Sequence, residues 1–386
     1  MKNLKLINLL LIVATSLLLV NCTTEPIYPE GPAGVDGIDG TNGKDGLNGA
    51  TGTTECATCH NVGKSEAVHA SYLFSGHAAG GAVGYAGSRA SCAKCHSNEG
   101  YVDYITTGVT TNYDNPTAIS CKTCHDTHTT FDFENEGYDY ALRSIAPVDL
   151  ITDASYTINY MGTSNNCAQC HQPRRTPPVD DGSGVFKVTS SHWGPHHGPQ
   201  STFLEGIQGA ELAGSLDYKA PQSATHRTGS SCTSCHMGAT SGETDGNHTW
   251  IPTSTACTEC HTAGAPDGVA GLEEDMSALA LLLEDVVGWE YQYEVDGDGE
   301  LVEDANGDPI KVLDANGDPV MIDVHGIIHD GHPNNGSFGQ GATFTFTESQ
   351  AAWNYLLVME DASKGTHNPA YARSLIKNSI EGVSAN

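Results

Sequence analysis

One five-residue pattern, Cys-x-x-Cys-His, occurs six times in this chain of 386 residues. The six copies are Cys56–His60, Cys92–His96, Cys121–His125, Cys167–His171, Cys232–His236 and Cys257–His261. Two thiols three positions apart can reach both vinyl groups on one edge of a haem, and the next histidine then lies under the iron. One copy could be a redox dithiol. Six copies predict six covalently attached haem c groups.

The predicted roles divide between cysteines and histidines. The covalent attachment residues are Cys56, Cys59, Cys92, Cys95, Cys121, Cys124, Cys167, Cys170, Cys232, Cys235, Cys257 and Cys260. The proximal iron ligands are His60, His96, His125, His171, His236 and His261. Zinc ribbons also pair Cys-x-x-Cys motifs, but the histidine after every pair favours haem.

The thirteenth cysteine, Cys22, belongs to the N-terminal segment. Lys2 and Lys5 precede an apolar run over residues 9–20, which is too short for an ordinary membrane span and is typical of a signal peptide. A cysteine directly after this run resembles the lipobox of bacterial lipoproteins. We therefore expect residues 1–21 to be removed and Cys22 to be lipidated; the alternative is a secreted chain with an unpaired thiol. The lipid predicts an outer-membrane anchor, either at the cell surface or facing the periplasm.

Glycine occupies every third position from Gly31 to Gly52. This is the collagen register, although Pro32 is the only proline within it. Residues 22–52 are therefore predicted to form a lipidated tether with a collagen-like stalk. The stalk is either a flexible, extended spacer or a segment that assembles three chains.

The chain is strongly acidic, with a net charge of −30 and 17 basic residues. This balance argues against nucleic acid and against docking on an anionic membrane surface. Solubility at a cell surface explains the charge, and attraction of cationic partners or metal ions is the alternative.

Residues 53–270 are predicted to be a hexahaem cytochrome domain. Six motifs between residues 56 and 261, in a chain with 38% hydrophobic residues, leave little material for ordinary cores. The haems must then supply much of the buried apolar surface. We expect a mainly α fold with much irregular structure, wrapped around the haems.

Residues 271–386 are predicted to be C-terminal helices that pack on the haem domain. Apolar spacing predicts a helix over 272–287, Thr347 with Gln350 predicts a capping box, and Asn368 before Pro369 predicts the start of a final helix. Between them, residues 294–323 hold two near-copies of Asp-Ala-Asn-Gly-Asp-Pro, which predict a small β-hairpin insertion. A nonstandard calcium site is the alternative. A standard calcium hand needs Gly at the sixth loop position and Glu at the twelfth, and loops that start at Asp304 or at Asp296 have neither.

The histidines outside the motifs provide candidates for the second ligand of each iron. Of 18 histidines, six belong to the motifs, so the rest are twice what six bis-His haems require. Position relative to the motifs favours His77, His128, His196, His226 and His248. His128 is too close to His125 to fold back over the same haem and is expected to serve a neighbouring one. His197 is the alternative to His196, and the sixth ligand stays open among His192, His69, His332 and His367.

These segments resemble bacterial extracellular multihaem cytochromes, broadly relatives of the ammonia-forming nitrite reductases. The resemblance is carried by Ser75-Gly76-His77, the motif that ends in His128, Gly194-Pro-His196-His197-Gly-Pro-Gln200, His248-Thr-Trp250 and Gly365-Thr-His367-Asn-Pro-Ala-Tyr371. It implies stacked and T-shaped haem pairs and electron transfer across or away from the outer membrane. Some hexahaem members polymerise into filaments in which the next subunit donates one axial histidine. The catalytic relatives carry a Cys-x-x-Cys-Lys motif that this chain lacks.

The sequence therefore predicts an electron carrier with six bis-His haems, no catalytic residue, and other redox proteins as donor and acceptor. Self-association as a filament or a stalk trimer stays open. The first alternative is an oxidoreductase that reduces nitrite, hydroxylamine or a sulfur oxyanion at one open haem. The second is a cytochrome subunit of a larger respiratory complex at the cell surface.

Overall fold

The computed structural model describes residues 54–132, 135, 140–188, 193–239, 245–284, 286–296, 301–305, 309–325, 327–329, 332–333 and 344–385. The chain forms two compact units, Met1–Thr58 and Cys59–Asn386. The signal peptide, Cys22 and the stalk lie outside the described residues, so the expectations for them stay predictions. The same holds for the four-part division at residues 21, 52 and 270.

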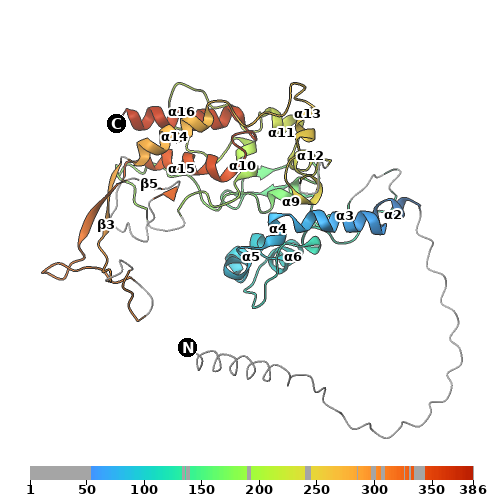
Figure 1. Cartoon of the computed structure of the whole chain (residues 1–386), viewed down its shortest axis with the longest axis horizontal. Coiled ribbons are helices and arrows are strands. Elements are labelled where there is room, and N and C mark those ends of the chain that lie inside the picture. The colour runs from blue at the N-terminus through green and yellow to red at the C-terminus, as the bar shows by residue number, and fades with distance from the viewer. Residues whose placement is uncertain are drawn as a thin grey trace, which may run out of the picture. The chain divides into compact units, whose positions relative to one another are not determined.

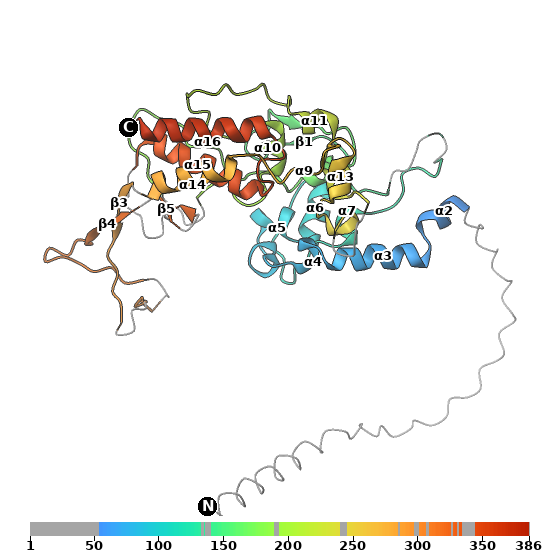
Figure 2. The ribbon, with the colours of Figure 1, turned by 45° about the horizontal axis from the view of Figure 1, so that its top comes forward.

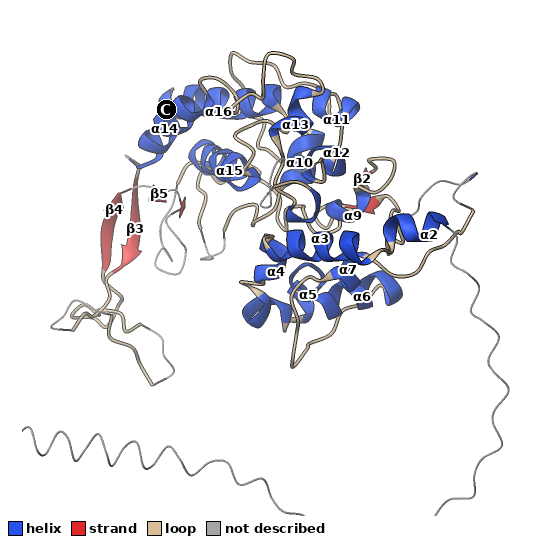
Figure 3. Cartoon of the chain, turned by 45° about the vertical axis from the view of Figure 1, so that its right-hand side comes forward, coloured by secondary structure: helices blue, strands red, loops and turns tan. Residues whose placement is uncertain are grey.

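The second unit is mainly helical, with short strands and long loops between the helices (Figure 3). Its helices are α3 Val62–Leu73, α4 Gly76–Ala79, α5 Ala90–His96, α6 Asn98–Thr107, α7 Cys121–Cys124, α9 Asn165–Ala168, α10 Gln200–Glu205, α11 Thr225–Gly229, α12 Cys232–His236, α13 Ser254–Thr258, α14 Leu272–Glu284, α15 Phe346–Asp361 and α16 Pro369–Ser384. Two further turns are η1 Val83–Gly87, a π-helix, and η2 Asn247–Thr249, a 3₁₀-helix. The described strands pair antiparallel in twos: β1 Val148–Asp149 with β2 Thr157–Ile158, β3 Val287–Tyr291 with β4 Met321–His325, and β5 Ile328–His329 with β6 His332–Pro333. The prediction of a mainly α fold with much irregular structure is confirmed at this level.

Helices α14, α15 and α16 lie together and form the main apolar core (Figures 1 and 2). Trp353, Leu357, Leu375 and Ile376 are fully buried in it. The Nε1–H of Trp353 donates to the Gln208 carbonyl at 2.8 Å. The one polar atom of this large ring is thereby satisfied, so its burial carries no unpaired donor.

The predicted start of α15 is wrong by two residues. Thr345, not Thr347, caps the helix: its Oγ1 accepts the N–H of Glu348 at 3.2 Å, and the Glu348 carboxylate accepts the N–H of Thr345 at 2.9 Å. Both Thr-x-x-Glu and Thr-x-x-Gln satisfy the capping pattern. Tertiary contact decides between them, because Gln350 donates instead to the Pro178 carbonyl at 2.9 Å.

The other two helix predictions for this region hold. Helix α14 begins at Leu272 as expected and ends at Glu284, three residues early. Asn368 caps α16 by accepting the N–H of Tyr371 at 3.2 Å, and Pro369 takes the first helical position.

The hairpin insertion is a two-stranded antiparallel sheet that follows α14. Strand β3 lies before the predicted bounds of 294–323, and β4 begins inside them and ends two residues beyond, with Val287 opposite His325 and Tyr291 opposite Met321. The second Asp-Ala-Asn-Gly-Asp copy forms the expected turn. There the Asp314 carboxylate accepts the N–H groups of Asn316 at 2.8 Å and Asp318 at 2.9 Å. Residues 306–308 of the first copy are outside the described residues.

The region that carries the motifs has a smaller apolar core than the three C-terminal helices. Its second apolar cluster consists of six buried residues, Val148, Leu150, Ile158, Tyr160, Ala168 and Leu204. Elsewhere its helices approach by backbone contact: a Cβ on Gly100 of α6 would lie 2.4 Å from the carbonyl carbon and oxygen of Ala93 in α5. A side chain at Gly100 would therefore push α6 away from the motif helix α5. No helix among the described residues is long and apolar enough to cross a membrane.

Candidate haem-binding sites

Each attachment motif begins on a short helical segment. The segments are α2 (Thr54–Cys59), α5, α7, α9, α12 and α13. Residues three apart share one face of a helix, so one turn presents both cysteine sulfurs of a motif on the same side. None of the twelve motif cysteines, all within the described residues, forms a disulfide.

Local capping starts two of these helices at the first cysteine. Ser120 caps α7 in a reciprocal capping box with Thr123, and Ser231 caps α12 in one with Ser234. Such a box satisfies two backbone donors that a short helix would leave open. It therefore stabilises a four- or five-residue helix that has little propensity of its own.

Every motif histidine has one other histidine facing it. The ring-centroid separations are 6.0 Å for His60 and His128, 5.9 Å for His96 and His196, 6.2 Å for His125 and His248, 6.1 Å for His171 and His77, 6.1 Å for His236 and His367, and 6.0 Å for His261 and His226. All six partners come from the candidates named from the sequence. All six pairs form within one chain.

The separation of the rings matches what one shared metal requires. A metal–imidazole bond is about 2 Å long and the ring centroid lies about 1 Å beyond the nitrogen, so two imidazoles on opposite sides of one ion have centroids about 6 Å apart. Rings in direct contact can have a wider range of centroid separations, so we would not expect direct packing to give 5.9–6.2 Å in all six pairs. The residues therefore fit a haem iron with two axial histidines, next to the two cysteines that would attach its porphyrin.

Hydrogen bonds at Nδ1 orient several of these rings. The Nδ1 atoms of His125, His236 and His226 lie 2.8, 2.7 and 2.5 Å from the carbonyl oxygens of Tyr140, Trp250 and Thr366. A carbonyl oxygen only accepts, so each Nδ1 carries the proton and Nε2 keeps its lone pair. This tautomer is the one that binds metal through Nε2.

Two further rings have side-chain partners at Nδ1. His171 lies 3.0 Å from the Gln200 amide oxygen, and His367 lies 2.7 Å from a carboxylate oxygen of Asp361. The Nδ1 atoms of His77 and His248 are buried, and among the described residues they have no hydrogen-bond partner.

Burial favours the neutral form of several of these imidazoles. It lowers the pKa of His77 to about 4, with the nearby His171 as a further cause, and it also lowers the pKa values of His171, His236 and His248. His367 differs. Burial acts to lower its pKa, but the hydrogen bond and charge of Asp361 outweigh burial and raise it. A neutral imidazole is the form that ligates metal.

The remaining candidates do not face a motif histidine. His197 is exposed, and its Nδ1 lies 2.7 Å from the Glu360 carboxylate. His69 is exposed and stacks on Tyr72. His192 lies outside the described residues, and the side chain of His332 is not described. Among the open candidates for the sixth ligand, His367 is the one placed opposite a motif histidine.

The second and fifth motifs both lie next to the fourth. The Cys170 thiol lies beside Cys95 of the second motif, and the Cys167 thiol lies beside Cys232 of the fifth. Tyr101 donates to Asn166 at 2.5 Å and ties α6 to the same segment. Attachment points far apart in sequence are thus neighbours in space.

Trp250 joins three of the sites. Its ring lies 4.6 Å from that of His77 and 5.4 Å from that of His248, both edge-on, and its carbonyl accepts from His236. The backbone of Trp250 is in the left-handed region at φ 55°. From the sequence, Trp250 was noted only as part of a resemblance, and Asp361 was not noted at all. The position of Trp250 two residues after the candidate ligand His248 was a signal that could have identified it.

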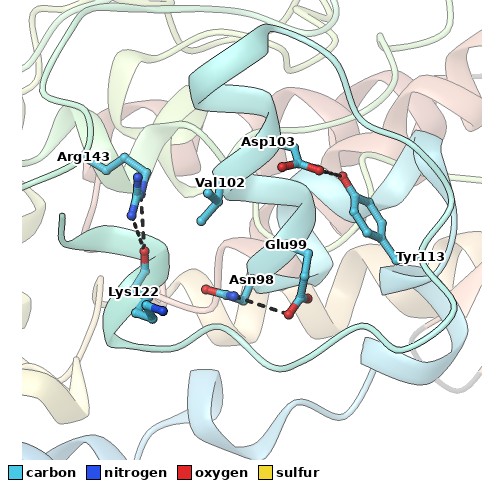
Figure 4. A pocket seen from close by; sticks show the side chains of 7 residues that line it. All are labelled: Asn98, Glu99, Val102, Asp103, Tyr113, Lys122 and Arg143. Carbon is cyan, nitrogen blue, oxygen red and sulfur yellow. Dashed lines mark hydrogen bonds between the residues drawn. The ribbon is translucent and has the colours of Figure 1, made fainter.

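A separate hollow of about 310 Å³ lies beside α6. It is lined by Asn98, Glu99, Val102, Asp103, Tyr113, Lys122 and Arg143, none of which is a predicted haem ligand (Figure 4). Three of its charged groups already have partners: Tyr113 donates to Asp103 at 2.7 Å, Thr117 donates to Glu99 at 2.6 Å, and Arg143 lies 2.9 Å from Asp126. Among the described residues, no group of three or more His, Cys, Asp and Glu side chains is placed to hold a metal ion by itself.

The chain is similar to one solved structure, the crystal structure of the outer cell wall cytochrome OcwA. The two share 17% sequence identity with a TM-score of 0.46, and the match covers 82% of this chain and 50% of that one. This chain thus spans about half the length of the structure it matches. No family model and no curated protein matches the chain.

Proposed function

We propose that this chain is a c-type cytochrome that carries electrons on six haems, each with two axial histidines. The six histidine pairs, all with centroids 5.9–6.2 Å apart, carry the proposal. The axial pairs are His60/His128, His96/His196, His125/His248, His171/His77, His236/His367 and His261/His226. When bound, each haem would supply an iron that takes up and releases one electron.

The residues of the chain support transfer rather than substrate chemistry. A histidine on both sides of each iron leaves no position for a small substrate. Contact between the fourth motif and the second and fifth brings attachment points together, as a set of electron carriers needs. Since His367 of the same chain faces His236, the sixth ligand does not require a second subunit.

The cellular setting is also part of the proposal. The predicted lipid on Cys22 and the glycine-rich stalk support a tethered protein outside the cell envelope that exchanges electrons with other redox proteins. Mass spectrometry of the mature N-terminus tests the lipid, and protease shaving of intact cells tests the surface location. An unmodified Cys22 would leave the haem proposal intact but remove the anchor.

The decisive experiment combines haem counting with EPR on the purified holoprotein. We expect six haems per chain, all low-spin and none that binds carbon monoxide. His77→Ala should convert one haem to high-spin, because it removes one axial ligand. His197→Ala is the matched control and should leave all six low-spin, because His197 is exposed and faces no motif histidine. A high-spin haem in the unmodified protein that binds nitrite or carbon monoxide would favour the oxidoreductase alternative.

A further inference from the structure

The site of the fifth motif has a buried carboxylate next to the histidine that faces His236. His367 hydrogen-bonds a carboxylate, Asp361, at 2.7 Å. The other Nδ1 partners are neutral: the carbonyls facing His125, His226 and His236 and the amide of Gln200 facing His171. Among these oriented rings, His367 is therefore the one held by an anion.

Asp361 is built into this position by the fold. It is the last residue of α15, and the chain turns there through Ala362 in the left-handed conformation, φ 57°. The side chain of Asp361 is 0% exposed, whereas the ring of His367 is 21% exposed. Burial keeps solvent from screening the carboxylate, so its charge acts on His367 in a low-dielectric environment.

The second oxygen of the carboxylate is also engaged. Ser363 donates its hydroxyl to Asp361 Oδ2, and the Ser363 oxygen accepts the backbone N–H of His367 at 3.2 Å. The peptide oxygen of Asp361 accepts from Gln200, whose own amide oxygen faces His171. Asp361, Ser363 and His367 thus form one closed hydrogen-bonded group with a fixed geometry.

We propose that Asp361 is a positioning residue that lowers the reduction potential of the haem that would be attached at Cys232 and Cys235. The inference rests on the proposed function. An anionic acceptor makes the imidazole more basic, and a more basic ligand stabilises the oxidised iron over the reduced iron. In a redox titration, the one-electron reduction of this iron by the added reductant would remove one positive charge beside a buried carboxylate, which costs energy.

Asp361→Asn tests the proposal in the full-length holoprotein. The amide has nearly the same shape and keeps an oxygen that accepts from His367, but it has no charge. In an EPR-monitored redox titration we expect the midpoint potential of the fifth site to move upward while the other five stay in place. The fifth site is assigned by the low-spin signal that His367→Ala removes.

Glu360→Gln is the matched control. Glu360 is the adjacent acidic residue and bonds His197, which faces no motif histidine. This variant removes the same charge from the neighbouring position, so the midpoint potential of the fifth site should not move. Equal shifts in both variants would overturn the proposal in favour of a general effect of net charge.

Ser363→Ala decides the matter if Asp361→Asn fails to fold. It removes the second donor to the carboxylate, which leaves more of the negative charge to His367, and the midpoint potential of the fifth site should fall further. Six low-spin haems with unchanged potentials in the folded variants would overturn the role of Asp361 and leave the proposed function standing. Fewer than six haems, or a high-spin haem, in the unmodified protein would instead contradict the proposed function.

Discussion

The two ends of the second unit reach a folded state by different means. The C-terminal region, residues 272–385, supplies most of the main apolar core, in which Leu357, Leu375 and Ile376 are fully buried together with Phe203 of α10. The attachment region, residues 59–264, has a smaller cluster of six buried apolar residues and leaves Phe131 76% and Leu73 61% exposed. The difference teaches that helices with a wide apolar face supply most of a core, whereas the loop-rich segment with the six motifs has less apolar packing of its own, which the proposed haems would add.

The largest effect should come from making the chain without haem attachment, in a host that lacks cytochrome c maturation. We expect amides of the attachment region to exchange as in an unfolded chain, because this region has few buried apolar contacts of its own. Amides in α15 and α16 should keep protection. Hydrogen exchange with mass spectrometry measures both in one sample, and equal protection in the two regions would refute the contrast.

Breaking the one buried ion pair between α10 and α11 is next in size. Arg227 Nε lies 2.6 Å from Glu205 Oε1, and the Glu205 side chain is 0% exposed. Arg227→Ala should cost about 3–5 kcal/mol in the free energy of unfolding, because it leaves a buried carboxylate unpaired. Denaturant unfolding of the holoprotein measures the loss. Lys364→Ala, at an exposed pair with Asp267, should cost at most about 1 kcal/mol.

A substitution in the C-terminal core tests how much the buried side chains of this region contribute to stability. Trp353→Ala should cost about 3–5 kcal/mol, from the lost apolar contacts and the cavity that remains. Phe74→Ala, at a site 54% exposed, should change stability by about 0.5 kcal/mol or less in the haem-free chain. Thermal unfolding measures both losses. If Phe74→Ala lost as much stability as Trp353→Ala, the contrast in packing between the two regions would be wrong.

The smallest expected effect comes from substituting each of two threonines at the start of α15. Thr345→Ala removes the observed cap and should cost about 1 kcal/mol in the free energy of unfolding. Thr347→Ala changes the residue that the sequence pattern favoured and should be within about 0.5 kcal/mol of the unmodified protein. A larger loss for Thr347→Ala than for Thr345→Ala would mean that Thr347 caps the helix.

Some elements of the fold follow from short stretches of chain. The last helix begins at Asn368 and Pro369 as predicted, because capping acts within four residues. The turn at Asp314 also forms as predicted, since its hydrogen bonds are local. The start of α15 was not predictable, because two overlapping capping patterns compete and a distant carbonyl, that of Pro178, engages Gln350.

By itself, the sequence determined which residues are predicted to attach haem and which histidines are candidates for the second axial position. The covalent pattern is complete within five residues, so no folding information is needed to recognise it. Only the tertiary structure decided which histidine faces which motif, that His367 rather than His69 faces His236, and that Asp361 bonds His367. Axial partners come from segments tens of residues away, and contacts over such separations are set by packing of the whole chain rather than by local pattern.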